Sequence, residues 1–226
     1  MKVVIINASF RINGATAKIL SEFANQLNLH TDTDVEIVHL SNLNIEYCQG
    51  CCSCYKTGTC FLGGDAEMLS QTISAADGLI IGSPCYTSGV SGQLKTFIDR
   101  GHFVIEQLLK DKHTIGVVTY ENVGGGSVWS ALKTLFLFSG AKTVDKLVVK
   151  IPFNSNPVEV EKIKMQIKNK ADKLYSSMRN KSSSPLIKIK QFFILNFGIK
   201  PFVIKKGEAY QGVLHHWRER GILHNE

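Results

Sequence analysis

The 226-residue sequence has no apolar run long enough to cross a membrane. A transmembrane helix needs about 20 consecutive, mainly apolar residues. The longest apolar segment, residues 192–204, is interrupted by Asn196, Gly198, Lys200 and Pro201. The first residues, MKVVIINAS, have the pattern of a strand and a loop, without the charged start, apolar stretch and cleavage site of a secretory signal. We therefore expect a cytoplasmic protein with no membrane partner.

Several motifs of common functional sites are also missing from the sequence. The chain contains neither G-x-x-x-x-G-K-[ST] nor G-x-G-x-x-G, which disfavours a nucleoside triphosphatase and a standard dinucleotide site. We find no Ser/His/Asp arrangement for nucleophilic catalysis. The adjacent His215 and His216 receive no catalytic role, and we interpret His102 and His113 as structural.

The charge pattern gives little support to nucleic-acid binding. The formal net charge is +7, and a basic surface can bind nucleic acids or anionic cofactors. The lysines concentrate between Lys162 and Lys206, on segments with helical or loop patterning. The sequence shows no helix-turn-helix signature and no aromatic-rich basic face. We interpret these lysines as a solvated helix and tail, and we expect no nucleic-acid partner.

Short apolar segments rich in Val and Ile alternate with helix-length segments along the chain. The predicted strands are residues 2–7, 35–40, 78–83, 114–120 and 146–152. Most of them are apolar on both faces, which is typical of a parallel sheet covered by helices. Residues 15–27, 65–76, 91–109 and 127–140 space their apolar side chains at three and four, as amphipathic helices do. The order predicts an α/β fold: a doubly wound, five-stranded parallel sheet with helices on both faces.

The last third of the chain departs from this alternation. A final helix is predicted from about Pro157 to Met178, and SSSP at residues 182–185 marks a linker. Residues 186–226 form a C-terminal extension without a sixth strand of the same type. We therefore divide the chain into a domain of residues 1–180 and a linker with C-terminal extension, residues 181–226.

Three unusual loops follow predicted strands, at the sheet edge where ligands bind in such folds. The loop after the first strand, NASFRINGATAKIL, supplies a hydroxyl, a guanidinium, an amide, a flexible turn and a helix N-cap. These groups come from Ser9, Arg11, Asn13, Gly14 and Thr16. The N-terminus of a helix binds phosphate through its free N–H groups and its dipole. This loop therefore favours a phosphate site over an ordinary turn.

The other two loops offer backbone groups and an aromatic ring. In GSPCYTSGVSGQLKTFIDR, residues 82–100, Pro84 and the glycines predict a rigid bend, and Tyr86 can lie against a flat ring. Ser91 is expected to cap the helix that follows. In TYENVGGGSVW, residues 119–129, three consecutive glycines let the backbone approach a ligand without a Cβ atom in the way. A flexible surface loop is the alternative for the glycine run.

Two motifs together carry a family resemblance. S-x-R-x-x-G-x-T and G-S-P-x-Y-x-x-x-x-S-G-x-L-K-x-F-I-D-R resemble the NADPH-dependent FMN reductase branch of the flavodoxin-like superfamily, over about residues 1–150. The resemblance implies an FMN-binding domain. It assigns the phosphate to Ser9, Arg11, Asn13, Gly14, Ala15 and Thr16. It assigns the isoalloxazine ring to Pro84, Cys85, Tyr86, Thr87, Ser88 and Gly89 on one side and to Gly124, Gly125 and Gly126 on the other.

Five of the six cysteines fall within CQGCCSCYKTGTC, residues 48–60, here called the cysteine loop. Cytosolic thiols are kept reduced, so such a cluster indicates metal binding or redox chemistry more than disulfides. One choice of four has the spacing C-x2-C-x2-C-x5-C: Cys48, Cys51, Cys54 and Cys60. Such compact spacing suits a cubane iron–sulfur cluster. A zinc ion also accepts four thiolates, and a loop without metal is the third interpretation.

The position and spacing of these cysteines resemble the compact motif of the iron–sulfur flavoproteins, a subgroup of the same superfamily. This resemblance implies a 4Fe–4S cluster held by Cys48, Cys51, Cys54 and Cys60. Cys52 is then spare and is expected to point outward. We interpret Cys85 as a small buried apolar side chain more than as a redox thiol.

The two resemblances imply an FMN-dependent oxidoreductase or electron-transfer flavoprotein. It would pass electrons from a reduced donor, NAD(P)H among the candidates, to a redox partner protein or a small-molecule acceptor. Because the cofactors supply this chemistry, we assign no catalytic residue. The resemblance also implies a homodimer or homotetramer in which the cluster of one subunit faces the flavin of another. Two alternatives stay open: a cluster-free NAD(P)H-dependent reductase of FMN, quinones or azo compounds, and a non-enzymatic flavodoxin-like electron carrier.

Overall fold

The computed structural model describes residues 1–223, in which five parallel strands form one sheet. The strands are β1 (Lys2–Asn7), β2 (Asp34–His39), β3 (Gly78–Pro84), β4 (His113–Tyr120) and β5 (Lys142–Lys150). Their order, β2-β1-β3-β4-β5, is the flavodoxin-like order. The predicted fold class is confirmed.

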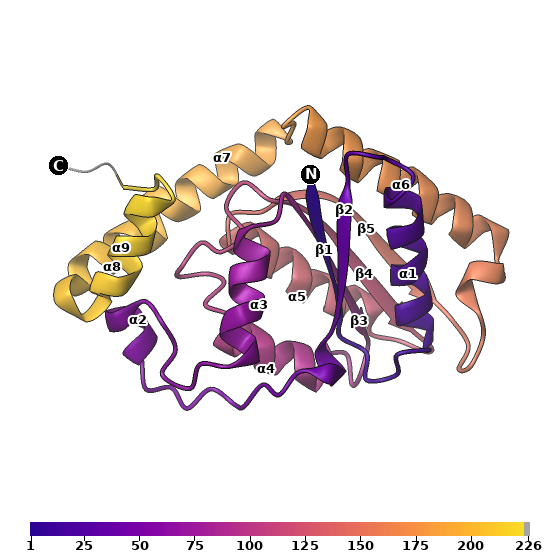
Figure 1. Cartoon of the computed structure of the whole chain (residues 1–226), viewed down its shortest axis with the longest axis horizontal. Coiled ribbons are helices and arrows are strands. Elements are labelled where there is room, and N and C mark those ends of the chain that lie inside the picture. Colours follow the sequence, from indigo (N-terminus) through magenta and orange to yellow (C-terminus); the bar gives the residue numbers. More distant parts are fainter. Residues whose placement is uncertain (224–226) are drawn as a thin grey trace.

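Helices cover both faces of the sheet (Figure 1). One face packs against α1 (Ala15–Leu27) and α6 (Glu161–Arg179), and the other against α3 (Asp65–Ser74), α4 (Gly92–Arg100) and α5 (Gly125–Phe138). Strand β1 contributes to the hydrophobic cores on both faces of the sheet. Val3 and Ile5 pack in the core under α1 and α6, and Val4 and Ile6 pack in the core under α3, α4 and α5. Successive strand side chains point to opposite faces, so a strand buried on both faces must be apolar throughout.

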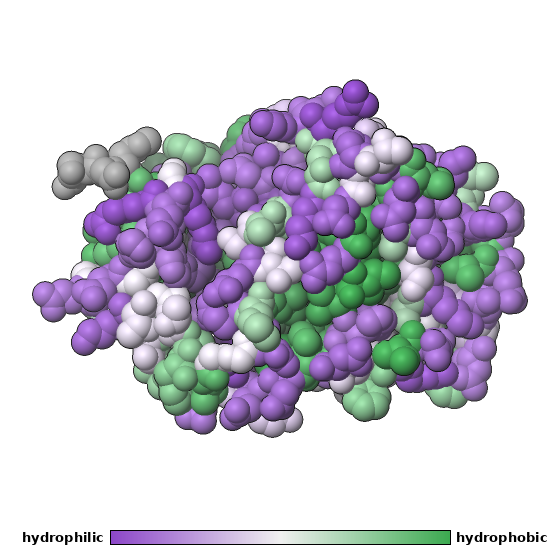
Figure 2. Space-filling model, viewed as in Figure 1, coloured by the Kyte–Doolittle hydropathy of each residue, from purple (hydrophilic) through white to green (hydrophobic). Residues whose placement is uncertain are grey.

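Strand β2 lies at the edge of the sheet and is less buried than the others. Its Asp34 and Glu36 are exposed, while Val35 and Ile37, which alternate with them, are half-buried. Figure 2 shows apolar side chains in the middle of this face of the molecule, over the β1–β2 part of the sheet. The partial exposure of β2 accounts for the alternation in this segment.

The predicted helix over residues 91–109 is wrong beyond Arg100, where α4 ends. Residues 101–111 form a series of turns, and His102, Gln107 and Asp111 have positive φ. Phe103 folds back onto Phe97, with their ring centroids 5.3 Å apart. A Cβ at Gly101 would lie 2.6 Å from the Phe103 ring, so the glycine permits this reversal. The apolar side chains of this segment are buried in the core, so their spacing resembled that of a continuing helix although the segment folds back.

Other boundaries differ by smaller amounts from those predicted. Strand β5 begins at Lys142, earlier than predicted, and ends at Lys150. The predicted final helix is split into a 3-10 turn, η2 (Pro157–Glu159), and α6. A 3-10 turn, η1 (Leu40–Asn42), follows β2, and the short helix α2 (Ser53–Thr57) lies within the cysteine loop.

The C-terminal extension is helical over its described residues and contains no strand there, as expected. It consists of α7 (Pro185–Phe193), the π-helical turn η3 (Ile194–Ile199), α8 (Lys200–Lys206), the 3-10 turn η4 (Gly207–Tyr210) and α9 (Gln211–Glu219). Figure 1 shows it running away from α6 to end beside α2. The division between residues 180 and 181 stays a prediction, and it falls between the end of α6 and the start of α7.

Helix α9 is anchored to the domain by a small core of its own. Val203, Val213 and Trp217 are fully buried there, and the Trp217 indole N–H donates to the Ile105 carbonyl at 3.0 Å. His216 Nδ1 lies 2.8 Å from Oε2 of the buried Glu106. This contact gives His216 a structural role. In the described part of the chain, no helix combines the length and apolar character needed to cross a bilayer.

Candidate functional site

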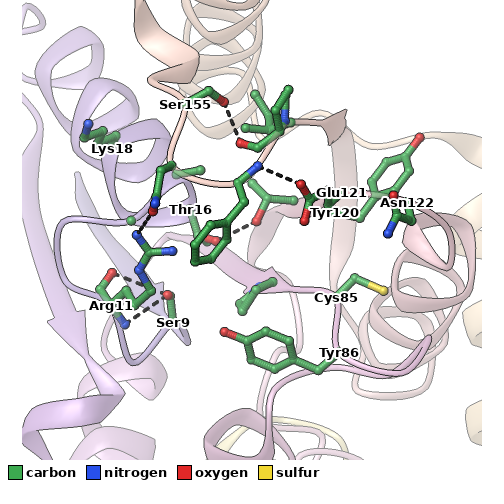
Figure 3. A pocket seen from close by; sticks show the side chains of 18 of the residues that line it. Ser9, Arg11, Thr16, Lys18, Cys85, Tyr86, Tyr120, Glu121, Asn122 and Ser155 are labelled. Atoms are coloured by element: carbon green, nitrogen blue, oxygen red, sulfur yellow. Dashed lines mark hydrogen bonds between the residues drawn. The ribbon is translucent and has the colours of Figure 1, made fainter.

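A cavity of about 560 Å³ lies at the carboxyl edge of the sheet, between the loops that follow β1, β3, β4 and β5. Figure 3 shows Ser9, Arg11 and Lys18 on one side and Cys85 and Tyr86 on the other. Most residues of the two predicted flavin motifs line it: Ser9, Arg11, Asn13, Gly14, Ala15, Thr16, Pro84, Cys85, Tyr86, Thr87 and Ser88. Gly89, Gly124, Gly125 and Gly126 are not among the lining residues.

The loop between β1 and α1 is held in shape by its own hydrogen bonds. The Asn7 side chain accepts from the Ser9 N–H at 3.1 Å, and Ser9 Oγ accepts from the Arg11 N–H at 3.2 Å. Gly14 is the N-cap of α1, which corrects the prediction that Thr16 caps the helix. The buried Thr16 hydroxyl lies 2.7 Å from the Thr119 hydroxyl of β4 instead. This bond ties the first turn of α1 to the sheet.

The N-terminus of α1 is suited to bind an anion. No side chain in the described structure caps this terminus, so the first N–H groups of α1 have no acceptor within the helix and are free to bind a ligand. Its first turn, ATAK, contains no acidic residue. Arg11 and Lys18, both lining residues, add positive charge. The helix dipole, free donors and two cations together form the physical elements of a phosphate site.

The loop after β5 completes the cavity, and the sequence interpretation missed it. Arg11 donates to Asn154 Oδ1 at 2.6 Å, and its guanidinium carbon lies 4.7 Å from the Phe153 ring centroid. Glu121 accepts from the Phe153 N–H at 3.0 Å, which fixes this loop to the one after β4. No ligand motif marks residues 151–155, and the predicted strand extended to residue 152.

The opposite wall contains a tight turn with strained backbone. Tyr86 and Gly89 exchange N–H···O bonds of 3.1 and 2.9 Å, with Thr87 and Ser88 between them at φ 49° and 59°. Such left-handed conformations cost about 1–3 kcal/mol each in residues with a side chain. They persist where the surroundings enforce them and are concentrated at ligand sites.

The glycine run supports this turn more than it lines the cavity. Gly124 has φ 91°, and a Cβ there would lie 2.7 Å from Ser88 Oγ and 2.9 Å from Cys85 Sγ. A Cβ at Gly125 would lie 2.4 Å from the Tyr120 ring, whereas Gly126 has open space. Gly124 therefore lets the two loops pack closely. The lining on this side comes from Tyr120, Glu121, Asn122 and Val123, which the glycine-based prediction missed.

The cavity fits FMN in size and chemistry. Its volume is within the usual range of small-molecule sites, about 300–1,000 Å³. The anion-binding end is suited to the phosphate, and Tyr86, which is 53% exposed, offers an aromatic face at the other end. Cys85 is half-buried with its thiol 3.6 Å from the Val123 carbonyl oxygen, which suits a packing role. The assignment of individual residues to the flavin stays a prediction.

The cysteine loop is shaped by left-handed turns. Gly50, Cys52 and Gly58 have φ of 67°, 58° and 84°, and α2 carries Cys54 between the last two. All six cysteines lie within the described residues and are free thiols. Cys52 is exposed, as are the predicted ligands Cys48 and Cys51, and it lines a hollow of about 250 Å³ together with Cys48 and Cys54.

The thiols lie close enough to influence one another. Burial, followed by the charge of Cys60 and smaller contributions from Cys51 and Cys48, raises the pKa of Cys54 to about 11. These thiols could ionise together only with a cation between them, and their donor chemistry fits an iron–sulfur cluster or zinc. Within residues 1–223, however, no three Cys, His, Asp or Glu side chains converge on a common metal position. The loop thus collects the predicted ligands without arranging them around one point.

Helix α9 presses directly against the cysteine loop. A Cβ at Gly212 would lie 2.1 Å from the backbone nitrogen of Gly58, so only glycine allows this approach. The Tyr55 and Tyr210 rings stack beside it at 4.7 Å between centroids. The position of Cys54 and Cys60 therefore depends on the C-terminal extension, a connection that the sequence interpretation did not include.

Comparison with known proteins identifies the family of the chain. A model of the family described as NADPH-dependent FMN reductase matches residues 1–155. The chain belongs to this family. It is 37% identical to an iron–sulfur flavoprotein of Clostridioides difficile (strain 630), over 99% of this chain and all of the relative. An iron–sulfur flavoprotein of Archaeoglobus fulgidus is also 37% identical, over 55% of this chain and 56% of that protein. This FMN reductase family member falls in the iron–sulfur flavoprotein subgroup, as the cysteine motif predicted.

Solved structures that resemble this family member confirm its fold. An NADH:FMN oxidoreductase in its apo form superposes with a TM-score of 0.60 at 18% identity, over 82% of this chain and 92% of the other. A flavodoxin from the domain Archaea gives a TM-score of 0.54 at 12% identity, over 79% and 99% of the two chains. At such low identity the likeness concerns the fold alone.

Proposed function

We propose that this flavin oxidoreductase transfers electrons between FMN, bound in the cavity at the carboxyl edge of the sheet, and a 4Fe–4S cluster on the cysteine loop. The observation that carries the proposal is the presence of two separate sites in one chain. One is a cavity with an anion-binding helix terminus, and the other is a loop with four thiols at cluster spacing. Family membership supports the flavin, and the relatives named iron–sulfur flavoproteins support the cluster.

The residues of the cavity bind and orient the flavin. The α1 N–H groups and Ser9 hold the phosphate, and Arg11 and Lys18 neutralise its charge. The strained turn around Thr87 and Ser88 places backbone groups and Tyr86 against the ring. When bound, FMN supplies one- or two-electron transfer and the cluster supplies one-electron transfer. No protein nucleophile or general base is needed.

The two sites lie far apart within one chain. Figure 1 shows α2, in the cysteine loop, near one end of the longest axis, and α1, whose N-terminus borders the cavity, across the sheet from it. We therefore place electron transfer between subunits of a homodimer or homotetramer, with the cysteine loop of one subunit near the cavity of another. NAD(P)H or a reduced protein is the proposed donor, and a small molecule or redox protein is the acceptor.

Anaerobic purification, a visible spectrum and counts of flavin and iron test this function. We expect about one FMN and about four iron atoms per chain. Serine at Cys48, Cys51, Cys54 or Cys60 should remove iron and leave flavin, while the matched variant Cys52→Ser should keep both. A colourless protein that stays colourless after incubation with FMN would overturn the proposal.

One observation favours a second candidate, a cluster-free NAD(P)H-dependent reductase. The cysteine side chains of the described structure do not converge on one metal position. This candidate predicts flavin without iron in the anaerobic protein, together with steady-state NAD(P)H oxidation that the four cysteine variants leave unchanged.

A further inference from the structure

The extension carries several exposed apolar side chains, here called the apolar ridge. It consists of Leu186, Ile189, Phe192, Phe193, Phe197 and Phe202. Phe197 is 71% exposed, and its ring lies 6.3 Å from Phe192 and 5.5 Å from Phe193 between centroids. Single exposed apolar residues are normal on protein surfaces, but contiguous patches mark interaction sites.

The ridge adjoins the side chains with which the same segment packs against the domain. On the inner side, Val203 is fully buried, and Leu195 and Ile199 pack against the core that contains Trp217. The segment from Pro185 to Lys206 therefore packs some apolar side chains against the domain and leaves the ridge exposed to solvent. Beside the ridge, Phe193, Phe197 and Phe202 border an open hollow of about 640 Å³ with Ile105 and Phe138.

Lysines lie beside the ridge. Lys188 and Lys190 are the chain neighbours of Ile189, so each lies about 100° around the helix from it, and both are exposed. The Lys206 ammonium lies 5.3 Å from the Phe202 ring centroid. Residues 181–206 contain six lysines and no acidic residue.

We propose that the apolar ridge docks onto the surface of a bilayer that contains anionic lipids. A helix that lies on a membrane needs an apolar face at the level of the acyl chains and flanking lysines at the level of the headgroups. The ridge and its lysines provide both. Asn196, Gly198 and Lys200 exclude a membrane span, but they do not interfere with a helix that lies along the surface. The proposal departs from the sequence-based expectation of no membrane partner.

The positive charge around the ridge favours an anionic bilayer over a second copy of the chain as its binding partner. Self-pairing through the ridge brings two sets of six lysines together, in a protein whose net charge is already +7. Like charges across an interface oppose association. Anionic headgroups attract the same lysines, each with a favourable contribution that salt screens.

Vesicle flotation of the full-length protein tests the proposal. Vesicles of equal parts phosphatidylglycerol and phosphatidylcholine should bind it, vesicles of phosphatidylcholine alone should bind it far more weakly, and added salt should release it. Phe193→Ser/Phe197→Ser should weaken binding by about tenfold or more. Lys188→Gln/Lys190→Gln should weaken it by about tenfold on the anionic vesicles only.

The matched control is Leu29→Ser/Met165→Ser, which removes two exposed apolar side chains away from the ridge and should bind as the wild type does. The oligomeric state of each variant is measured by ultracentrifugation. If the wild-type protein stays off the anionic vesicles, the proposal is wrong. It is also wrong if Phe193→Ser/Phe197→Ser dissociates the oligomer and leaves vesicle binding unchanged, since the ridge is then a subunit interface. If a variant fails to fold, the dependence of wild-type vesicle binding on lipid charge and on salt still tests the proposal.

Discussion

Replacing Gly212 with alanine tests the dependence of the cysteine loop on helix α9. The added Cβ would lie 2.1 Å from the Gly58 nitrogen and 2.7 Å from both Gly58 Cα and the Thr57 carbonyl carbon. These contacts are with backbone, which cannot turn aside as a flexible side chain can. Either α9 or the cysteine loop must therefore move by about an ångström or more to restore a normal contact.

The size of the effect follows from the packing. Overpacking of a tight site costs about 1–3 kcal/mol. For a protein of this length, each kcal/mol lowers the melting temperature by about 2–4 °C, so we expect a decrease of about 2–12 °C. Because Gly58 lies between Cys54 and Cys60, we also expect Gly212→Ala to lose iron while it keeps FMN.

Gly92→Ala is the matched control for this substitution. Gly92 is the first residue of α4, has no positive φ, and has open space where a Cβ would be. Alanine there should be neutral or stabilising by about 0.4–1 kcal/mol. Thermal unfolding by circular dichroism and iron counts on anaerobic protein compare the two variants. If Gly212→Ala melts and binds iron as Gly92→Ala does, α9 does not support the cysteine loop.

Three further predictions concern the cavity and the domain that carries it. Arg11→Gln should weaken FMN binding by about tenfold to a hundredfold in a fluorescence titration and leave riboflavin binding unchanged, since one charge-assisted bond is worth about 1.5–3 kcal/mol; equal losses for both ligands would contradict a phosphate contact. Burial alone would raise the pKa of Asp145, but hydrogen bonds from Lys170 and Lys173 hold it at about 2, below its ordinary value of 3.8. The ion pairs therefore stabilise the fold above about pH 4, and this stabilisation is lost as the pH falls through 2. Asp145→Asn should therefore cost about 1–2 kcal/mol in urea unfolding at neutral pH, allowing for partial exposure, and a cost independent of pH would refute the ion pairs. Ser91→Ala should cost about 1 kcal/mol through loss of the α4 cap, and an unchanged urea midpoint would show that the 3.3 Å bond contributes nothing.

The sheet was predictable because its determinants are local. Segments such as KVVIIN are apolar on both faces, and the structure buries Val3, Val4, Ile5 and Ile6 completely. The N-cap role of Ser91 was predicted from its position before the α4 segment and is confirmed. These features depend on the period and residue type of a few neighbouring positions.

Features that depend on distant contacts were not predictable in this way. Helix α4 ends where it does because Phe103 folds back over Gly101, and the apolar spacing of that segment gave no sign of the reversal. The loop that bears Phe153 and Asn154 joins the cavity through partners more than thirty residues away. The sequence marked the cysteines, but not the approach of Gly212 that fixes their loop.

Anomalous diffraction from crystals of anaerobically purified protein tests the two-site account most directly. The account predicts iron peaks beside Cys48, Cys51, Cys54 and Cys60, and flavin density in the cavity with its phosphate at the N-terminus of α1. Flavin density at any other edge of the sheet would contradict it, as would iron bound away from the cysteine loop.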